Sequence, residues 1–413
     1  MTTETSILQG LLAQQPNLEE IARAGAQHMI AMAMEAEIRL FMKQYEEITN
    51  PEGKAVMVRN GYLPERKITT SAGPVSVKVP RSRATVNSLK PFVSALIPRY
   101  MRKSIHIEEA VPLFYLGGLS NNDFMPAFEQ LFGELPAGFS SASITRMKQL
   151  WLEEHRSWNK RDLSLSRYCY LWADGIYFNL RLDKGRLCVL VLIGATPEGK
   201  KELVAVCGGY RESTESWLEV LRDLKERHMP SPKLCIGDGA LGFWKALREV
   251  YPTAEKQRCW VHKTANVLDK LPKSIQSSAK SLIHDIYRAE TERDARSAYQ
   301  RFQDRYQAKY PKAVENLKKD EASLFTFYHY PAEHWQHIRS TNVIESAFST
   351  VRLRTAKTRG QGTMVTTLSM VFKLAERAQL RWQRLRGHQL ITKVFEGVNL
   401  STELRKHLQL RTV

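Results

Sequence analysis

The sequence of 413 residues is poor in the features that mark exported, membrane-spanning or disulfide-bonded proteins. It holds five cysteines, an odd number, and no two of them form a C-x-x-C pair. Free thiols of this kind are typical of a reducing cytoplasm. The longest apolar run, LCVLVLI at 187–193, is far too short to span a bilayer, and the first residues lack a basic flank and an apolar signal core. We therefore expect a cytoplasmic protein with no membrane partner.

Acidic residues are too few to balance the basic ones. The chain has 61 Lys and Arg against 43 Asp and Glu, a net charge of +18, which favours a polyanionic partner, nucleic acid first, over a neutral metabolite. The excess is concentrated, because residues 51–103 carry a net charge of +9 and residues 351–413 one of +10. Residues 1–50 hold 3 Lys and Arg against 7 Glu. A uniformly solubilising surface would not be distributed in this way.

Residues 1–50 predict an N-terminal helical region. Apolar residues recur at helical spacing over 18–48, with no proline among them. The glycine in this stretch, Gly25, costs only about 1 kcal/mol relative to alanine and does not end the pattern. We interpret the helix as a dimerisation element.

Residues 51–155 predict a DNA-binding region. A β-ribbon over 59–81 begins with the turn signal Asn60-Gly61 and continues into the alternating strand VSVKV. Glycines and serines then delimit three short helices over 105–155, in the layout of a helix-turn-helix. A small helical bundle fits the same pattern equally well.

From residue 168 onward the pattern is that of an α/β protein. Residues 165–262 contain three strand-like runs, a helix, a strand, a second helix and a further strand-like run. This order predicts a mixed sheet and is the order of a ribonuclease-H-like core. Residues 263–337 predict an all-helical insertion. Residues 338–413 are expected to complete the core and to continue as basic helices.

Two aspartates stand at unusual places in apolar strands. Asp174 interrupts YLWADGIYFNLR at 170–181, and Asp238 ends the strand in LCIGDGALGFWKAL. A buried carboxylate is costly unless it is paired, hydrogen-bonded or bound to a metal. Two carboxylates that meet at strand ends repel each other unless a cation lies between them, which indicates a hard divalent metal. Taken singly, an aspartate before a glycine is more often a turn residue.

A third acid strengthens the metal interpretation. In HIRSTNVIESAFSTVRLRT, Ser340 or Thr341 is expected to cap a helix that carries Glu345 in its first turns. Arg352 lies seven residues later, on the same face of that helix. An isolated glutamate at this place is common, because it favours a helix N-terminus. Two strand aspartates with a helix glutamate, however, supply the oxygen ligands of a two-metal site for phosphoryl transfer.

From the RNGY motif at residue 59 to about residue 385, the sequence resembles the Mutator-like transposases of bacterial insertion sequences. These are DDE recombinases with a ribonuclease-H-like core. The strongest parts are YLWADGIY, CIGDGALGFWKAL, AEKQRCWVHKTANVLDKLPK and YPAEHWQHIRSTNVIES. The resemblance implies that Asp174, Asp238 and Glu345 form the catalytic triad and bind two Mg²⁺ ions, for which Mn²⁺ can substitute. It also implies a helical insertion between the second and third acids.

The resemblance extends to residues around the triad. Cys259 and His262 match a C-x-x-H element of the family, and since the sequence has no second pair at zinc-ligand spacing, we expect His262 to face the DNA backbone or the acids. An Arg-x-Thr-Asn element is expected to hold a phosphate beside Glu345. Trp335 is a candidate for base stacking, with a core position as the alternative. The predicted DNA contacts are His262, Trp335, Arg339, Thr341, Asn342 and Arg352.

The sequence thus predicts an insertion-sequence transposase. It would bind terminal inverted repeats and target DNA as a homodimer or larger oligomer, and it would cleave and transfer DNA strands in the bacterial cytoplasm, on the nucleoid when bound to DNA. A catalytically inactive regulator descended from a transposase is the alternative, against which the intact triad argues. A ribonuclease acting on RNA hybrids fits the core, but it does not account for the two basic segments.

Overall fold

The chain divides into two compact units, Met1–Met147 and Lys148–Val413. The structure, a computed structural model, describes residues 17–87, 89–107, 114, 126, 129–130, 141–179, 186–209, 211–239, 241–349, 351–352 and 363–397. Each unit has a hydrophobic core of its own. Within the described residues, no helix is long and apolar enough to cross a membrane.

The first unit begins with the predicted helix, α2 (Leu18–Lys43). Its first turn is closed by a capping box, in which Asn17 Oδ1 accepts from the Glu20 N–H at 2.8 Å and the Glu20 carboxylate accepts from the Asn17 N–H at 3.1 Å. Met34 and Ile38 are the buried residues of the helix. They lie on one face because they are four residues apart, and Met34 joins the core of this unit.

The predicted ribbon is present as two antiparallel strand pairs. The pairs are β1 (Met57–Tyr62) with β4 (Pro80–Ala84), and β2 (Arg66–Thr70) with β3 (Gly73–Val77). The predicted turn at Asn60-Gly61 is wrong: both residues lie within β1, where the register shifts between Arg59 and Tyr62 and Gly61 has a φ of 67°. This is a β-bulge, which uses the same positive φ that favours Asn-Gly in turns. The tight reversal occurs instead between Thr70 and Gly73.

Most of the predicted helix-turn-helix lies outside the described residues. Its third helix is described as α5 (Ser141–Trp158), at the position the sequence predicts. The first two predicted helices fall mainly in 108–140, so their arrangement stays a prediction.

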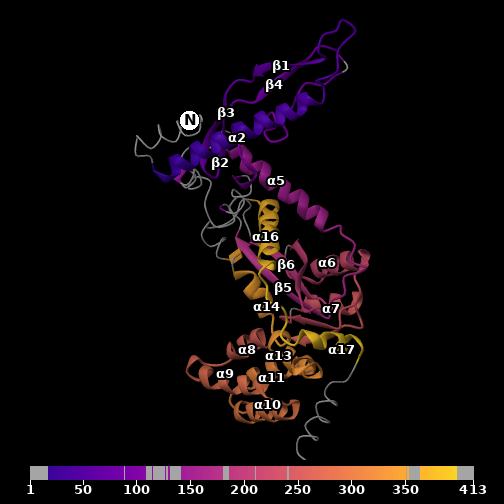
Figure 1. Ribbon diagram of the computed structural model, residues 1–413. Helices are drawn as coiled ribbons and strands as arrows, with labels where there is room; N and C mark the ends of the chain where they lie inside the picture. Colours follow the sequence, from indigo (N-terminus) through magenta and orange to yellow (C-terminus); the bar gives the residue numbers. More distant parts are fainter. Residues whose placement is uncertain are drawn as a thin grey trace, which may run out of the picture. The chain divides into compact units, whose positions relative to one another are not determined.

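The second unit is built on a five-stranded mixed sheet, as predicted (Figure 1). The strand order is β7-β6-β5-β8-β9. β6 is antiparallel to β5 and β7, whereas β8 is parallel to both β5 and β9. The bounds are β5 (Tyr170–Asn179), β6 (Arg186–Ala195), β7 (Lys201–Gly209), β8 (Leu234–Gly237) and β9 (Glu255–Arg258).

Helices cover both faces of this sheet. Figure 1 shows α6 (Thr214–Glu226) and α7 (Leu241–Val250) on one side, with α14 (Asn342–Ala347) and α16 (Met364–Gln379) on the other. The sheet is therefore buried on both faces, which explains why β6 is a continuous apolar run, RLCVLVLIGA, and does not alternate.

The segment between β9 and α14 is helical, and all of it is described. Its elements are α8 (Trp260–Leu268), α9 (Lys273–Arg288), α10 (Glu292–Tyr306), α11 (Pro311–Lys318), α12 (Glu321–Leu324), the 3-10 helix η1 (Thr326–His329) and α13 (Ala332–Ile338). After α16 come η2 (His388–Leu390) and α17 (Ile391–Phe395). No strand occurs over 260–338, in agreement with the predicted helical character of this segment.

A buried ion cluster ties these helices to the sheet. Asp320, which precedes α12, lies 2.5 Å from Lys263 Nζ of α8 and 3.2 Å from Arg258 Nε of β9. Both cations are almost completely buried. Gly239, after β8, has a φ of 87°, and a Cβ there would lie 2.2 Å from Arg258 Nε. Glycine at this position therefore leaves the space that the Arg258 side chain occupies.

Candidate active site

Asp174 and Asp238 are placed side by side by strand register. β5 and β8 run parallel and pair Ala173 with Gly237. Asp174 follows Ala173 within β5, and Asp238 follows Gly237 directly after β8, so the two aspartates stand at the same level beyond the last pair. This edge of an α/β sheet is where ligands bind as a rule.

Side-chain alternation decides which face Asp174 occupies. Leu171 belongs to the hydrophobic cluster under α6 and α7, together with Phe243. Trp172 points to the opposite face, where its Nε1 donates to the His337 carbonyl of α13 at 2.9 Å. Asp174 has the same parity as Trp172, so it projects from the face that α13 and α14 cover.

The C-x-x-H element reaches the same edge from the next strand. β8 and β9 pair Gly237 with Arg258, and the N–H of Cys259 donates to the Gly237 carbonyl at 2.8 Å. Cys259 is the N-cap residue of α8, which puts His262 in the first turn of that helix. The parallel strands β5, β8 and β9 are neighbours, and Asp174, Asp238 and His262 therefore lie at the same edge of the sheet.

Glu345 approaches this edge from α14. Its Oε1 lies 4.0 Å from His262 Nε2, and its side chain is 37% exposed. The acids of the predicted triad are therefore gathered in one region, although they lie on separate elements.

The Arg-x-Thr-Asn element differs in part from the prediction. Thr341 is fully buried and makes no side-chain cap; its N–H and hydroxyl lie 3.3 and 3.5 Å from Cys259 Sγ, and the hydroxyl lies 3.3 Å from His262 Nδ1. Thr341 is thus placed to position Cys259 and His262, and it is not at the surface where a DNA contact was expected. α14 ends at Ala347, so Arg352 does not extend the face of Glu345 along one continuous helix. Asn342 and Arg352 are both exposed.

The electrostatics of the site are set by the burial of Asp174 and by the acids that lie near it. Burial raises the pKa of Asp174 to about 6; the charges of Asp238 and Glu345 add to the rise and His262 opposes it. Within the strand, the carboxylate accepts a hydrogen bond from the Gly175 N–H at 3.0 Å. One hydrogen bond from a backbone N–H does not replace the hydration that a carboxylate loses on burial.

His262 carries the opposing charge. The hydrogen bond with Cys259 raises the pKa of His262 to about 9 against the effect of burial, and the charges of Cys259, Asp174 and Asp238 add to the rise. Burial raises the pKa of Cys259, but its hydrogen bonds and the charge of His262 outweigh burial, and the net shift is downward. An imidazolium at neutral pH beside three carboxylates follows from this arrangement.

The donor set fits a hard divalent cation. Carboxylate oxygens are the ligands that Mg²⁺ and Mn²⁺ prefer, and acids that repel one another gain most from a cation between them. Within the described residues, no three His, Cys, Asp or Glu side chains already enclose a metal position. Glu345 stands on the short helix α14 with a part-exposed side chain.

A fourth acid, Glu212, is present and was missed by the sequence analysis. It lies just before Ser213, the N-cap residue of α6, and is half-buried. Burial raises the pKa of Glu212 to about 7, and the charges of Asp238 and Asp174 add to the rise. In the sequence, an acid beside a capping serine is typical of any helix start, so the pattern gave no sign of this position.

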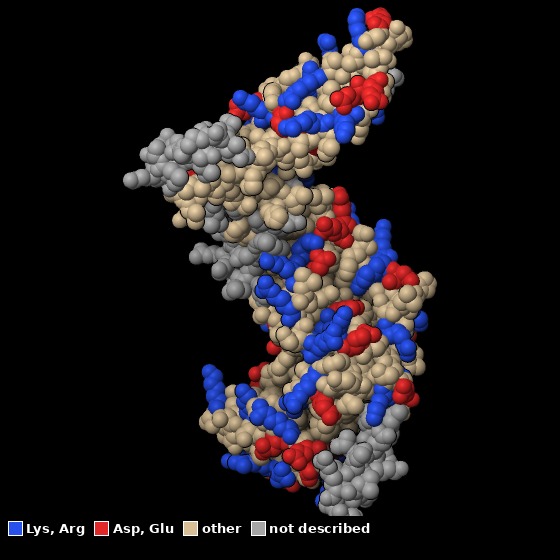
Figure 2. All heavy atoms as spheres, viewed as in Figure 1, with Lys and Arg blue, Asp and Glu red and all other residues tan. Residues whose placement is uncertain are grey.

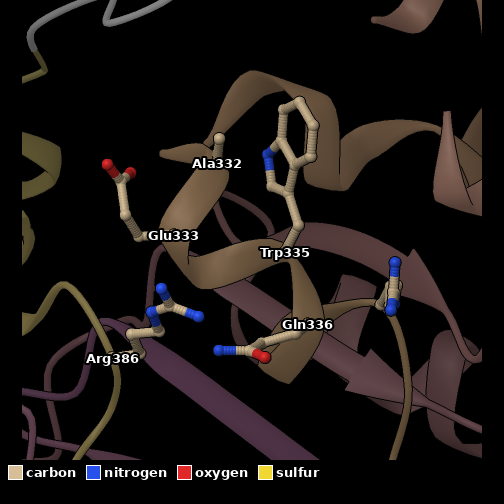
Figure 3. Close-up of a pocket in the computed structure, with 6 residues that line it drawn as sticks. Ala332, Glu333, Trp335, Gln336 and Arg386 are labelled. Carbon is tan, nitrogen blue, oxygen red and sulfur yellow. The ribbon is translucent and has the colours of Figure 1, made fainter. Parts of the chain in front are cut away.

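A pocket of about 340 Å³ contains two of the predicted DNA contacts. Figure 3 shows Glu333, Trp335 and Gln336 projecting from α13, with Arg386 nearby from the segment after α16. The Trp335 indole is half-buried and its Nε1 donates to the Tyr330 carbonyl at 2.7 Å, which fixes the ring. Arg339, which also lines the pocket, donates from Nη1 to the Tyr287 carbonyl at 3.0 Å.

Basic side chains lie along the ribbon of the first unit. In β4, Ser82 is buried while Arg81 and Arg83 are exposed, because alternate residues of a strand face opposite sides. Figure 2 shows Lys and Arg side chains on the surfaces of both units, interspersed with Asp and Glu. The exposed arginines of β4 agree with the basic edge that the sequence predicts for the ribbon.

The sequence of the whole chain identifies its family. A profile described as "Transposase, Mutator family" matches residues 2–384. The chain belongs to the Mutator family of transposases. It is 51% identical over 291 residues to the transposase for insertion sequence element IS6120 of Mycolicibacterium smegmatis, which covers 70% of this chain and 90% of that protein. It is 44% identical over 285 residues to the transposase for insertion sequence element IST2 of Acidithiobacillus ferrooxidans, which covers 69% of this chain and 96% of that protein.

Among solved structures, the catalytic core domain of the HTLV-2 integrase in complex with magnesium is similar to part of this Mutator-family chain. The match has a TM-score of 0.19 and 11% identity, and it covers 31% of this chain and 90% of that chain. A score this low does not establish a shared fold. The family resemblance that the sequence motifs indicate is, in contrast, confirmed by the profile match.

Proposed function

We propose that this Mutator-family protein is an active insertion-sequence transposase of the DDE type, with a ribonuclease-H-like core that cleaves and joins DNA strands. The proposed catalytic residues are Asp174, Asp238 and Glu345. The observation that carries the proposal is the register of β5 and β8, which puts two aspartates next to each other at the carboxyl edge of the sheet. The membership of the chain in a transposase family makes strand cleavage and transfer the chemistry that such a site would serve.

The three carboxylates would hold two Mg²⁺ ions, or Mn²⁺ in their place. When bound, such ions activate the attacking water or 3′-hydroxyl and stabilise the leaving oxygen. The chain's own contribution is to fix Asp174 and Asp238 on a rigid sheet, so that little ordering is needed when DNA arrives. Glu345, on α14, would be the third carboxylate ligand and would approach from outside the sheet.

DNA would be held by cationic and aromatic groups around the acids. The His262 imidazolium, next to Glu345, is suited to a phosphate at the cleaved bond. Arg339 and Trp335 would engage a flanking nucleotide at their pocket, the ring by stacking and the guanidinium by its charge. Asn342 and Arg352 are exposed for backbone contacts, and the ribbon would contact the terminal repeats. A homodimer or larger oligomer would pair two ends of the element.

The test is cleavage of labelled duplex DNA that carries the inverted repeats flanking the reading frame. We expect Mg²⁺-dependent nicking and strand transfer by the wild type. Asp174→Asn, Asp238→Asn and Glu345→Gln should each lose both activities while binding the same DNA, because each substitution keeps the shape of the side chain and removes one ligand. Asp304→Asn, on the exposed side of α10, is the matched control and should remain active.

The same assay separates transposase from regulator. A catalytically inactive regulator would bind DNA that carries the repeats and would not cut it at any metal concentration. If a triad variant cleaves at close to the wild-type rate, that residue is not part of the site.

A further inference from the structure

Gly175 leaves an opening in β5 that a side chain from another element fills. A Cβ built at this residue would lie 2.3 Å from both Cδ and Oε1 of Glu212 and 2.5 Å from its Cγ. The carboxylate of Glu212 therefore lies directly against the backbone of the residue that follows Asp174. No other amino acid at position 175 would allow this approach without displacing the carboxylate.

Glu212 is held at this place by the start of α6. Ser213 caps the helix, with its Oγ accepting from the Ser216 N–H at 3.2 Å, so the backbone before the helix is fixed. The side chain of Glu212 then turns toward β5, where its carboxylate lies against Gly175. The charges of Asp238 and Asp174 both act on this carboxylate.

We propose that Glu212 contributes a fourth carboxylate to the divalent-metal site, reaching the carboxyl edge of the sheet from the α6 side at the Gly175 gap, whereas Asp174 reaches it from the opposite face. This inference rests on the proposed function, since the site it extends is the proposed triad. A glutamate that served only to shape the loop would not need to lie against Gly175, the strand residue that has no side chain and that directly follows a candidate ligand. The charges of Asp238 and Asp174 both oppose ionisation of Glu212, and a divalent cation bound at this edge would relieve that repulsion.

The experiment is a titration of the full chain with Mn²⁺ alone, without DNA, in which electron paramagnetic resonance measures the free ion. We expect Glu212→Gln to weaken Mn²⁺ binding by about tenfold or more, in the range typical of residues that support a metal site. Glu219→Gln is the matched control, because Glu219 is an exposed glutamate of α6, the helix that follows Glu212, and this variant should bind Mn²⁺ within twofold of the wild type.

A second measurement excludes a merely structural role. The metal-free Glu212→Gln variant should unfold at the same urea concentration as the wild type or at a higher one, because one of the repelling charges is gone. A lower midpoint together with unchanged Mn²⁺ affinity would show that Glu212 only supports the fold, and would overturn the inference.

Asp174→Asn in the same titration separates the two proposals. If Asp174→Asn loses Mn²⁺ binding while Glu212→Gln stays within twofold of the wild type, the role of Glu212 is refuted and the triad stands. If Asp174→Asn itself binds Mn²⁺ like the wild type, the metal site of the proposed function is wrong, and the inference fails with it.

Discussion

Replacing Asp174 by asparagine should stabilise the metal-free protein, and the effect should depend on pH. Burial and neighbouring acids raise the pKa of this carboxyl from 3.8 to about 6. Since one pKa unit corresponds to about 1.4 kcal/mol, the ionised carboxylate costs the folded state about 3 kcal/mol at pH 8. Asparagine keeps an oxygen that can accept from the Gly175 N–H and has no charge to desolvate.

The sign of the pH dependence follows from proton linkage. Because the folded state has the higher pKa, it binds more protons than the unfolded chain between about pH 4 and 6, so the wild type loses stability as pH rises through this range. Asp174→Asn should therefore raise the free energy of unfolding by about 3 kcal/mol at pH 8 and by only about 1 kcal/mol at pH 4.5.

Urea unfolding in EDTA, followed by tryptophan fluorescence, measures this difference. All eight tryptophans lie after residue 147, so the signal reports on the unit that contains Asp174. Asp304→Asn should change the free energy of unfolding by less than about 0.5 kcal/mol at either pH. The reasoning is refuted if Asp174→Asn is less stable than the wild type at pH 8. It is also refuted if the substitution changes the free energy of unfolding by the same amount at both pH values.

Three further predictions concern other parts of the chain. Asp320→Ala should lower the free energy of unfolding by about 3–5 kcal/mol, measured in urea, because it leaves two buried cations without their partner; a loss below 1 kcal/mol would contradict the ion cluster. Cys259→Ala should lower the pKa of His262 from about 9 toward its ordinary value, as followed by the NMR shift of the ring protons, and an unchanged pKa would show that the thiol is not the cause. Replacing both Arg81 and Arg83 by Gln should reduce the steepness of the plot of log binding constant against log salt concentration by about 1 to 2, for DNA that carries the terminal repeats. An unchanged slope would show that the ribbon does not contact this DNA.

Local sequence predicted the elements because their signals are local. Apolar residues at helical spacing predicted α2, and strand-like apolar runs predicted the strands of the sheet, β6 among them. Where one signal serves two structures, the prediction failed: Asn60-Gly61 favours a positive φ, which a turn and a β-bulge both use. Only the strand pairing distinguishes them, and pairing is not a local property.

The sequence by itself determined the family and the mixed α/β core. It also singled out three acids as candidates, two of them because a carboxylate in an apolar strand is costly unless something pairs with it. Tertiary structure alone decided which groups share the edge of the sheet. Thr341 matched a motif for DNA contact, yet folding buries it against Cys259. Glu212 stands where an acid is typical of any helix start, and it lies against the backbone that follows Asp174 only because Gly175 has no side chain. The identity of each residue is written in the sequence, whereas its distance from a residue tens of positions away is fixed only when the strands pair.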